Sequence, residues 1–371
     1  MKIPVCEPKL SGNELNYVTD CIKTGWISSL GDYIAKFEDK FRSFTGSKHA
    51  ITCSNGTAAL HLALQALGIG RGDEVIIPDL TMIAVPYSVI YTNARPVLVD
   101  AEMDTWNIDP EKIESKITGK TKAIIAVHTY GHPVDMDPVL EIAKKHGIYV
   151  IEDCAEAHGA LYKGKKVGSI GDIGCFSFYA NKILTTGEGG MVVTDDASVE
   201  KKIKLIKNMA FAEPRFSHFE IGFNYRMTNL QAAIGLAQME NAEELIDERM
   251  KVCRIYDSLF KNIPGIVRPP QNAWAKNVYW LYSMLIDDSF GASRDEVKRK
   301  LMEKGIDTRN FFTPMHRQPL FMKKDERFPA TSGLFPVADK LSRTGIQLPS
   351  GDNLSKEQVQ TVVEEILSLA K

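Results

Sequence analysis

The stretch GCFSFYANKILTTGEGGMVV, residues 174–193, sets the fold expected for the rest of the chain. It places Lys182 between two strand-like runs, with aromatic and small apolar residues before the lysine and a glycine-rich reversal after it. We therefore expect the ammonium at the mouth of a sheet and not on a solvated helix. Burial and cationic neighbours lower the pKa of a lysine, and the unprotonated amine can form a Schiff base with a carbonyl compound. A lone lysine is more often a solvated surface charge, so other motifs must support this interpretation.

The composition is ordinary for a globular protein. The chain has 371 residues, of which 44% are hydrophobic and 25% charged. This length suits one large domain and a smaller one. The formal net charge of -2 gives no general attraction to nucleic acids or anionic membranes, so neither is expected as a partner.

The first residues contain no apolar stretch typical of a signal peptide, and no apolar run is long enough to form a helix that crosses a bilayer. The six cysteines have no paired spacing, and most of them lie in apolar runs where a thiol packs as a small hydrophobic group. We therefore expect reduced cysteines and a cytoplasmic location.

Strand-like and helix-like patterns alternate from residue 48 onward. The expected strands cover residues 50–53, 74–77, 96–99, 123–128, 149–152, 175–178 and 191–194. The expected helices between them cover residues 57–67, 81–91, 110–117 and 136–146. Such alternation predicts an α/β fold with a mostly parallel sheet covered on both faces, and ligands then bind at the carboxyl ends of the strands.

The last third of the chain predicts a second, smaller domain. One long helical pattern runs from residue 229 to about 260 and ends near Pro264 and Gly265, which we interpret as a hinge. A strand-like run over 278–286, a helix over 294–304 and a terminal helix over 356–369 follow, which is an α+β pattern. We therefore divide the chain into residues 1–260 and residues 261–371.

Residues 54–61, SNGTAALH, run from the end of an expected strand into the first turn of a helix. Free backbone N–H groups and the positive end of the helix dipole meet at such a point, which makes it a candidate phosphate site around Gly56 and Thr57. An ordinary helix cap, with Ser54 or Asn55 as the capping residue, explains the same pattern.

Carboxylates end another buried strand at Asp153 and Glu156. Burial of a carboxylate is costly unless it has a partner, so these residues require an explanation. One explanation is a bound cationic group, and the other is capping of a strand-to-helix turn.

The motifs FSFYANK and TTGEGG around Lys182 resemble the lysine loop of the DegT-type sugar aminotransferases, and the resemblance runs from Pro4 to about Pro349. It implies the α/β fold of fold type I, with a large mostly parallel sheet domain and a smaller α+β C-terminal domain. It also implies pyridoxal 5'-phosphate (PLP) as cofactor, bound to Lys182. By the same resemblance, Gly56, Thr57 and Ser177 contact the cofactor phosphate.

The resemblance gives each carboxylate a partner on the cofactor. Asp153 is expected beside the pyridine nitrogen, where a carboxylate keeps the ring protonated and able to accept electrons. Glu156 is expected at the ring hydroxyl. Met82 stands where the family usually has an aromatic residue stacked on the ring, and its thioether can cover that face less firmly.

The segment GFNYRMTN, residues 222–229, resembles a family segment that reaches into the neighbouring subunit, so Asn224 is expected at the partner's cofactor phosphate. This implies a homodimer with shared active sites. A helix cap formed by Thr228 or Asn229 also explains the segment, and the two interpretations are compatible.

By the same resemblance, Ser28 and Ser29 border the substrate pocket, and His316 belongs to a substrate-side loop. The alternatives are a loop anchored by Trp26, which this interpretation expects to be buried, and a structural histidine.

The implied reaction is the transfer of an amino group from glutamate to C4 of a nucleotide-linked 4-keto-6-deoxy sugar, with ping-pong kinetics. GDP-4-keto-6-deoxymannose, which would give GDP-perosamine, is the expected substrate, and a UDP- or dTDP-linked keto sugar is the alternative. A sugar dehydratase is disfavoured because the family's dehydratases replace the lysine by histidine, whereas Lys182 is present. A non-catalytic cofactor-binding or sugar-binding regulator is disfavoured because Lys182, Asp153 and the Gly56–Thr57 pair are all present.

Two other patterns are set aside. The glycine-rich run of residues 68–72 follows a helix and precedes a strand, which is the reverse of the order in dinucleotide-binding folds, so we expect a plain loop. His128 and His132 have a spacing that suits zinc on a helix, but Gly131 and Pro133 interrupt any helix there, so no metal site is expected.

Overall fold

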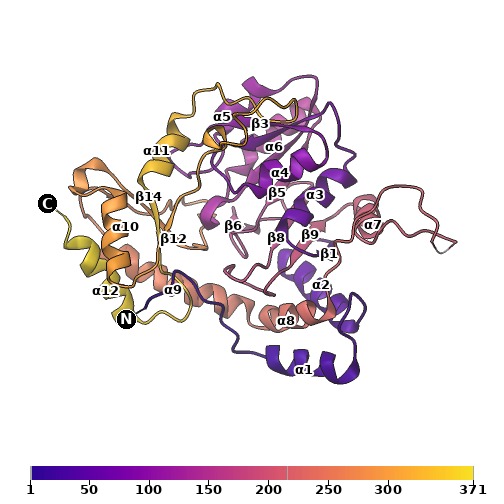
Figure 1. Cartoon of the computed structure of the whole chain (residues 1–371), viewed down its shortest axis with the longest axis horizontal. Coiled ribbons are helices and arrows are strands. Elements are labelled where there is room, and N and C mark those ends of the chain that lie inside the picture. The colour runs from indigo at the N-terminus through magenta and orange to yellow at the C-terminus, as the bar shows by residue number, and fades with distance from the viewer. Residues whose placement is uncertain (1, 215, 371) are drawn as a thin grey trace.

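The computed structural model describes residues 2–214 and 216–370, and it contains two main sheets with helices packed around them (Figure 1). The larger sheet has seven strands in the order β1-β9-β8-β5-β4-β2-β3. Its strands are β1 (His49–Cys53), β2 (Glu74–Pro78), β3 (Arg95–Val99), β4 (Thr121–Val127), β5 (Tyr149–Asp153), β8 (Ile173–Ser177) and β9 (Gly190–Thr194). Four neighbouring pairs are parallel, and only the two pairs made by β9 are antiparallel.

Helices cover both faces of this sheet. One face carries α3 (Gly56–Ala66), α4 (Ala84–Tyr91) and α7 (Ala197–Ile206). The other face carries α2 (Asp32–Thr45), α5 (Pro110–Ile113), α6 (Met136–His146) and α8 (Asn229–Glu240), and α1 (Glu14–Thr24) packs on α8. The predicted α/β fold is therefore confirmed.

The two-faced packing follows from strands whose central positions are mostly apolar. Successive side chains of a strand point to opposite faces, so a strand buried on both sides reads as a continuous apolar run. On β8, Cys175 belongs to the cluster under α3, and Phe176 belongs to the cluster under α2. On β5, Ile151 and Val150 divide between the two faces in the same way.

The second sheet is antiparallel and has the order β10-β12-β14-β13. Its strands are β10 (Ile266–Val267), β12 (Tyr282–Ile286), β13 (Arg309–Asn310) and β14 (Gly345–Leu348). The helices around it are α9 (Ala242–Leu259), α10 (Arg294–Glu303), α11 (Pro336–Thr344) and α12 (Lys356–Leu367). The N-terminal segment joins this part of the molecule, because Ile3 forms a bridge with Ile306 and is buried in the same apolar cluster. The division of the chain at residue 260 stays a prediction.

Short elements complete the chain. A small third sheet consists of β6 (Leu161–Tyr162), β7 (Lys165–Lys166) and β11 (Ala275–Lys276). The 3-10 helices are η1 (Glu114–Lys116), η2 (Thr129–Gly131), η3 (Asp288–Phe290) and η4 (Met315–Arg317). The run of residues 68–72 is a loop between α3 and β2, as predicted.

Several expected elements were wrong in extent. The helix expected over residues 110–117 is α-helical only to Ile113 and continues as a 3-10 helix. The helical pattern of residues 229–260 forms two helices, because Asn241 leaves the helical conformation with φ -114 and ψ 14. The strand expected over 278–286 begins only at Tyr282. Residues 278 and 280 instead donate their backbone N–H groups to the carbonyl oxygens of Gly131 and Tyr130, at 3.2 and 3.1 Å.

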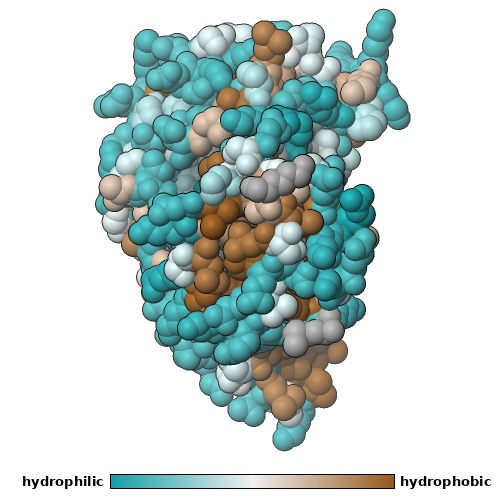
Figure 2. All heavy atoms as spheres, turned by 90° about the vertical axis from the view of Figure 1, so that its left-hand side faces the viewer, coloured by the Kyte–Doolittle hydropathy of each residue, from teal (hydrophilic) through white to brown (hydrophobic). Residues whose placement is uncertain are grey.

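In the part of the chain that the structure describes, no helix combines the length and apolarity that a membrane crossing requires. Figure 2 shows the face on the side of α10 and α12, where hydrophilic residues predominate around a central apolar area. A second group of apolar residues lies at the lower end of the molecule in this view.

We expect Gly174→Ala to destabilise the large sheet. A Cβ on Gly174 would lie 2.3 Å from the carbonyl oxygen of Gly168, and this backbone atom cannot move aside cheaply. Overpacking of this kind lowers the free energy of unfolding by ~1–3 kcal/mol. Urea unfolding followed by far-UV circular dichroism measures the change.

Gly119→Ala is the matched control, because a Cβ built there meets no other described heavy atom within 4 Å. The control variant should unfold within ~0.5 kcal/mol of the unsubstituted protein. Equal unfolding free energies for the two variants would contradict the close packing assigned to Gly174.

Candidate active site

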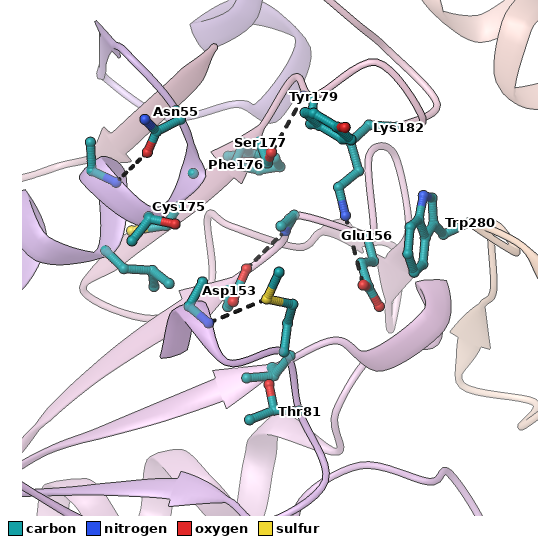
Figure 3. Close-up of a pocket in the computed structure, with 18 of the residues that line it drawn as sticks. Asn55, Thr81, Asp153, Glu156, Cys175, Phe176, Ser177, Tyr179, Lys182 and Trp280 are labelled. Carbon is teal, nitrogen blue, oxygen red and sulfur yellow. Dashed lines mark hydrogen bonds and ion pairs between the residues drawn. The ribbon is translucent and has the colours of Figure 1, made fainter. Parts of the chain in front are cut away.

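The carboxyl ends of several strands meet at one edge of the large sheet. Strands β2, β4, β5 and β8 are parallel, and β1 runs in the same direction because both β1 and β8 are antiparallel to β9. A cavity of about 760 Å3 opens at this edge, and Lys182, Asp153 and Glu156 all line it (Figure 3). The cavity thus lies at the carboxyl ends of the parallel strands, which is where a ligand site is expected in such a sheet.

Lys182 lies in the loop that connects β8 to β9. Its backbone N–H donates to the carbonyl oxygen of Tyr179 at 2.9 Å, which closes a turn at the end of β8. The Nζ atom lies 3.7 Å from Oε1 of Glu156 and 4.0 Å from the centre of the Trp280 ring. Burial lowers the pKa of the Lys182 ammonium, and the charges of Glu156 and Asp153 oppose that shift. The amine is thus closer to its nucleophilic form than an exposed lysine.

Asp153 is the last residue of β5, and Glu156 follows one turn later. Oδ1 of Asp153 accepts a hydrogen bond from the backbone N–H of Ala155 at 3.0 Å. Oε2 of Glu156 accepts one from the backbone N–H of Tyr130 at 2.9 Å. Burial raises the pKa of Asp153 and raises the pKa of Glu156 to about 7, although Lys182 lowers both. Glu156 can therefore gain or lose a proton near neutral pH beside the lysine amine.

The start of α3 packs against the end of β8 at one wall of the cavity. Asn55 caps α3, since its Oδ1 accepts from the backbone N–H of Ala58 at 2.8 Å. Gly56, Thr57 and Ser177 line the cavity, and a Cβ on Gly56 would lie only 2.7 Å from Cβ of Ser177. The helix cap and the candidate phosphate site are therefore compatible, because Asn55 supplies the cap while Gly56 and Thr57 line the cavity.

Thr81 and Met82 form another wall of the cavity. The Thr81 hydroxyl is buried and has no hydrogen-bond partner among the described residues. The Met82 side chain is 49% exposed, and its sulfur accepts from the backbone N–H of Ala84 at 3.3 Å. Met82 therefore lines the cavity, while its expected contact with the cofactor ring and its effect on cofactor affinity stay predictions.

The residues around the cavity fit PLP. A phosphate group suits the first turn of α3 beside the Ser177 hydroxyl, where a Cβ on Gly56 would close the space. The unpartnered Thr81 hydroxyl offers a further hydrogen bond. Two buried carboxylates and one buried amine are costly without a ligand, and a cationic ring with an aldehyde carbon supplies partners for them.

Four other predicted site residues do not line this cavity, namely Ser28, Ser29, Asn224 and His316. The Ser28 carbonyl oxygen accepts from the backbone N–H of Asn229 at 2.6 Å, and Ser29 lines a second cavity of about 270 Å3. Asn224 is exposed and forms a backbone bridge with Asn208. Their expected roles with substrate or with a partner chain stay predictions. The alternative for residues 28 and 29, a loop anchored by a buried tryptophan, is wrong because Trp26 is 56% exposed.

His316 does not line the cavity, and its ring nitrogens face two carboxylates. Its Nδ1 lies 2.7 Å from Oδ2 of the fully buried Asp79, and its Nε2 lies 3.3 Å from Oδ1 of Asp339. The ring also stacks on Phe335 at 4.8 Å between centres. These contacts support the structural alternative, because they attach the loop of residues 313–317 to the end of β2.

Sequence reasoning missed several residues that line the cavity. They are Tyr179, Asn181, Glu188, Tyr225, Trp280, Arg309 and Phe312. Three of them come from the C-terminal part of the chain, whose place over the cavity depends on tertiary packing. The residues nearest the quoted motif could have been found from its pattern, whereas Trp280 and Arg309 had no local signal.

A second group of buried polar residues lies behind β5. His128, Glu152 and Cys154 are close enough together to offer ligand atoms to one metal ion. However, both oxygens of Glu152 are engaged by backbone N–H groups of residues 168, 170 and 171, at 2.7 to 2.8 Å. Nε2 of His128 lies 3.0 Å from Oε2 of Glu152, and its Nδ1 accepts from the backbone N–H of Val134. These hydrogen bonds explain the burial of the group without an ion.

Comparison with known proteins confirms the resemblance. The DegT/DnrJ/EryC1/StrS aminotransferase family matches residues 8–367. The GDP-perosamine synthase of Escherichia coli O157:H7 is 47% identical over 368 residues, which cover 98% of this chain and 97% of that protein. The GDP-perosamine synthase of Caulobacter vibrioides is 46% identical over 364 residues, covering 98% of this chain and 96% of that protein.

The fold comparison agrees. The PLP form of a putative sugar aminotransferase from Streptococcus pneumoniae superposes with a TM-score of 0.92 at 26% sequence identity, covering 100% of this chain and 98% of that one. The sequence match, the shared fold and the lysine at the carboxyl edge of the sheet lead to one conclusion. This protein belongs to the DegT/DnrJ/EryC1/StrS aminotransferase family and is a PLP-dependent sugar aminotransferase.

Proposed function

We propose that this enzyme transfers an amino group from glutamate to C4 of GDP-4-keto-6-deoxymannose and so forms GDP-perosamine. The main support for this choice of substrate is the 47% identity, over 98% of this chain, to the GDP-perosamine synthase of Escherichia coli O157:H7. The reaction class is independent of that choice, since it rests on family membership and on the buried amine of Lys182.

Lys182 is proposed to hold the cofactor and to transfer protons. PLP, when bound, supplies the electron sink that stabilises a carbanion next to the transferred nitrogen. The Nζ atom of Lys182 takes the proton from Cα of the amino donor, and in the second half of the cycle it delivers a proton to C4 of the sugar. Its pKa, which burial lowers, makes the unprotonated amine accessible for the first of these steps.

The other residues at the cavity are proposed to bind and orient the cofactor. Asp153 would pair with the pyridine nitrogen, and its buried position makes a cationic partner favourable. Glu156 would hydrogen-bond to the ring hydroxyl. Gly56, Thr57 and Ser177 would bind the phosphate through backbone N–H groups and the serine hydroxyl.

A homodimer with shared sites is the proposed assembly. Asn224 is exposed and lies outside its own chain's cavity, although the neighbouring Tyr225 lines it. This arrangement supports the proposal that Asn224 reaches the cofactor phosphate of a second copy. A twofold interface would then create two equivalent sites. In that assembly, Ser28, Ser29 and His316 stay candidate substrate contacts.

The proposed location is the cytoplasm. The six cysteines, Cys6, Cys21, Cys53, Cys154, Cys175 and Cys253, are all free thiols, and five of them are buried. Reduced, buried cysteines are typical of a reducing compartment.

Lys182→Ala is expected to lower the rate of amino transfer from glutamate to the GDP-linked keto sugar by ~10³-fold or more, because it removes both the cofactor anchor and the proton carrier. Product formation is measured by chromatography of the nucleotide sugars. Lys163→Ala is the control, since that lysine is an exposed partner of Asp137. Wild-type turnover by Lys182→Ala would remove the lysine from the mechanism.

The enzyme is expected to prefer the GDP-linked keto sugar over its UDP- and dTDP-linked counterparts by ~10²-fold or more in kcat/KM. A pocket that hydrogen-bonds guanine leaves polar groups unpaired when a pyrimidine base occupies it. Steady-state kinetics on the three substrates, with glutamate as donor, measure the preference. A higher kcat/KM for the UDP or dTDP sugar would overturn the substrate and leave the aminotransferase intact.

Mixing two inactive variants tests the shared sites. In a shared dimer of Lys182→Ala and Asn224→Asp, one of the two sites keeps both native residues, so activity should return. The control mixes Lys182→Ala with Asp153→Asn, because these residues line the same cavity of one chain and no mixed site can be complete. The proposed sharing fails if neither mixture regains activity, or if a monomer in sedimentation analysis is fully active.

A further inference from the structure

The amine of Lys182 has two close neighbours, and they differ in kind. Oε1 of Glu156 lies 3.7 Å from Nζ, and the indole ring of Trp280 has its centre 4.0 Å from the same atom. Figure 3 shows the amine beside both side chains. A cation within about 6 Å of an aromatic ring face is attracted by the ring, most strongly by tryptophan. Trp280 therefore contributes to the environment of the amine as well as to the wall of the cavity.

One turn holds both neighbours in place. The backbone N–H of Tyr130 donates to Glu156 at 2.9 Å, and the carbonyl oxygen of Tyr130 accepts from the backbone N–H of Trp280 at 3.1 Å. Tyr130 has a φ of 56 and Gly131 has a φ of 101, so the turn is left-handed at both residues. A Cβ on Gly131 would lie 2.9 Å from the backbone nitrogen of Trp280, which explains the glycine. The carboxylate and the indole are thus positioned by the same backbone segment.

The indole ring is fixed at its other edge too. Its Nε1 donates to the carbonyl oxygen of Asn181 at 2.9 Å, and Asn181 directly precedes Lys182. The carbonyl oxygen of Trp280 accepts from Nη1 of the fully buried Arg249 at 2.5 Å, and Arg249 is itself paired with Asp352. Rotation of the indole away from the lysine would break the bond to Asn181 and leave a buried N–H unpaired.

We propose that Trp280 is a positioning residue for Lys182, whose indole face holds the ammonium form of the freed lysine beside the reacting carbon. This inference rests on the proposed function, in which Lys182 is released from the cofactor and carries a proton. Burial alone would favour the neutral amine and would let the flexible lysine side chain change rotamer. The indole opposes both effects, because it attracts the charged form and limits where the amine can lie.

The charged groups that face the amine set the sign of the expected pKa change. Glu156 and Asp153, at the end of β5, raise the pKa of Lys182, and Arg309 on β13 lowers it. None of these groups is altered when Trp280 is replaced. Loss of the indole removes an interaction with the charged form, so the pKa of Lys182 should fall further.

The test measures the pKa of the Lys182 amine in the full-length protein freed of cofactor. The rate at which acetic anhydride labels Lys182 is followed against pH by mass spectrometry, in wild type, Trp280→Phe and Trp280→Leu. We expect the apparent pKa to fall by ~0.5–1 unit in Trp280→Leu and by less in Trp280→Phe, whose ring attracts a cation more weakly. Lys207, also buried, serves as an internal reference in each sample.

Trp274→Phe is the matched control, because Trp274 packs on His132 and Tyr162 and does not line the cavity. It should leave the Lys182 profile unchanged. An unchanged profile in both Trp280 variants, or an equal shift in Trp274→Phe, would overturn the proposal. Because labelling needs neither cofactor nor substrate, failure here is distinguishable from failure of the proposed function, which the activity of Lys182→Ala decides.

Discussion

The interaction on which the site depends is the mutual stabilisation of one buried ammonium and two buried carboxylates. Each charge alone would be too costly to bury, and each lowers the cost of the others. Burial lowers the pKa of Lys182 and raises those of Asp153 and Glu156, while the opposite charges act against these shifts. Glu156, whose pKa burial raises to about 7, can therefore exchange a proton near neutral pH beside the Lys182 amine, and amino transfer requires such proton exchange.

The fold serves this interaction by fixing where each group lies. Strand β9 lies between β8 and β1 and is antiparallel to both, so β1 runs in the same direction as β8. The carboxyl end of β1, and the start of α3 that follows it, therefore reach the same edge of the sheet as the end of β8. The left-handed turn at Tyr130 and Gly131 links the end of β4 to the segment before β12. Side chains from both sheets thereby enclose one amine, and the second sheet is part of the active site as well as a packing partner.

Local patterns were sufficient for much of this arrangement. Continuous apolar runs identified the strands, and the residues that follow them, such as Asp153 and Gly56, were placed at the sheet edge without knowledge of the structure. The helix α2 was not predicted, and the pattern of residues 229–260 concealed the break at Asn241, where apolar spacing continues across a residue with non-helical φ and ψ. Trp280 was predicted to be part of a strand, because its local sequence is strand-like. Its position beside the lysine depends on tertiary hydrogen bonds to Tyr130 and Asn181, which have no local sequence signal.

The most direct test of the account follows the absorbance of the bound cofactor when glutamate is added to the purified enzyme without a sugar substrate. If Lys182 and the two carboxylates act as described, the visible absorbance of the pyridoxal form should disappear as the pyridoxamine form accumulates, and the GDP-linked keto sugar should restore it. A cofactor spectrum that glutamate leaves unchanged, in a protein that binds PLP, would contradict amino transfer as the function of this site.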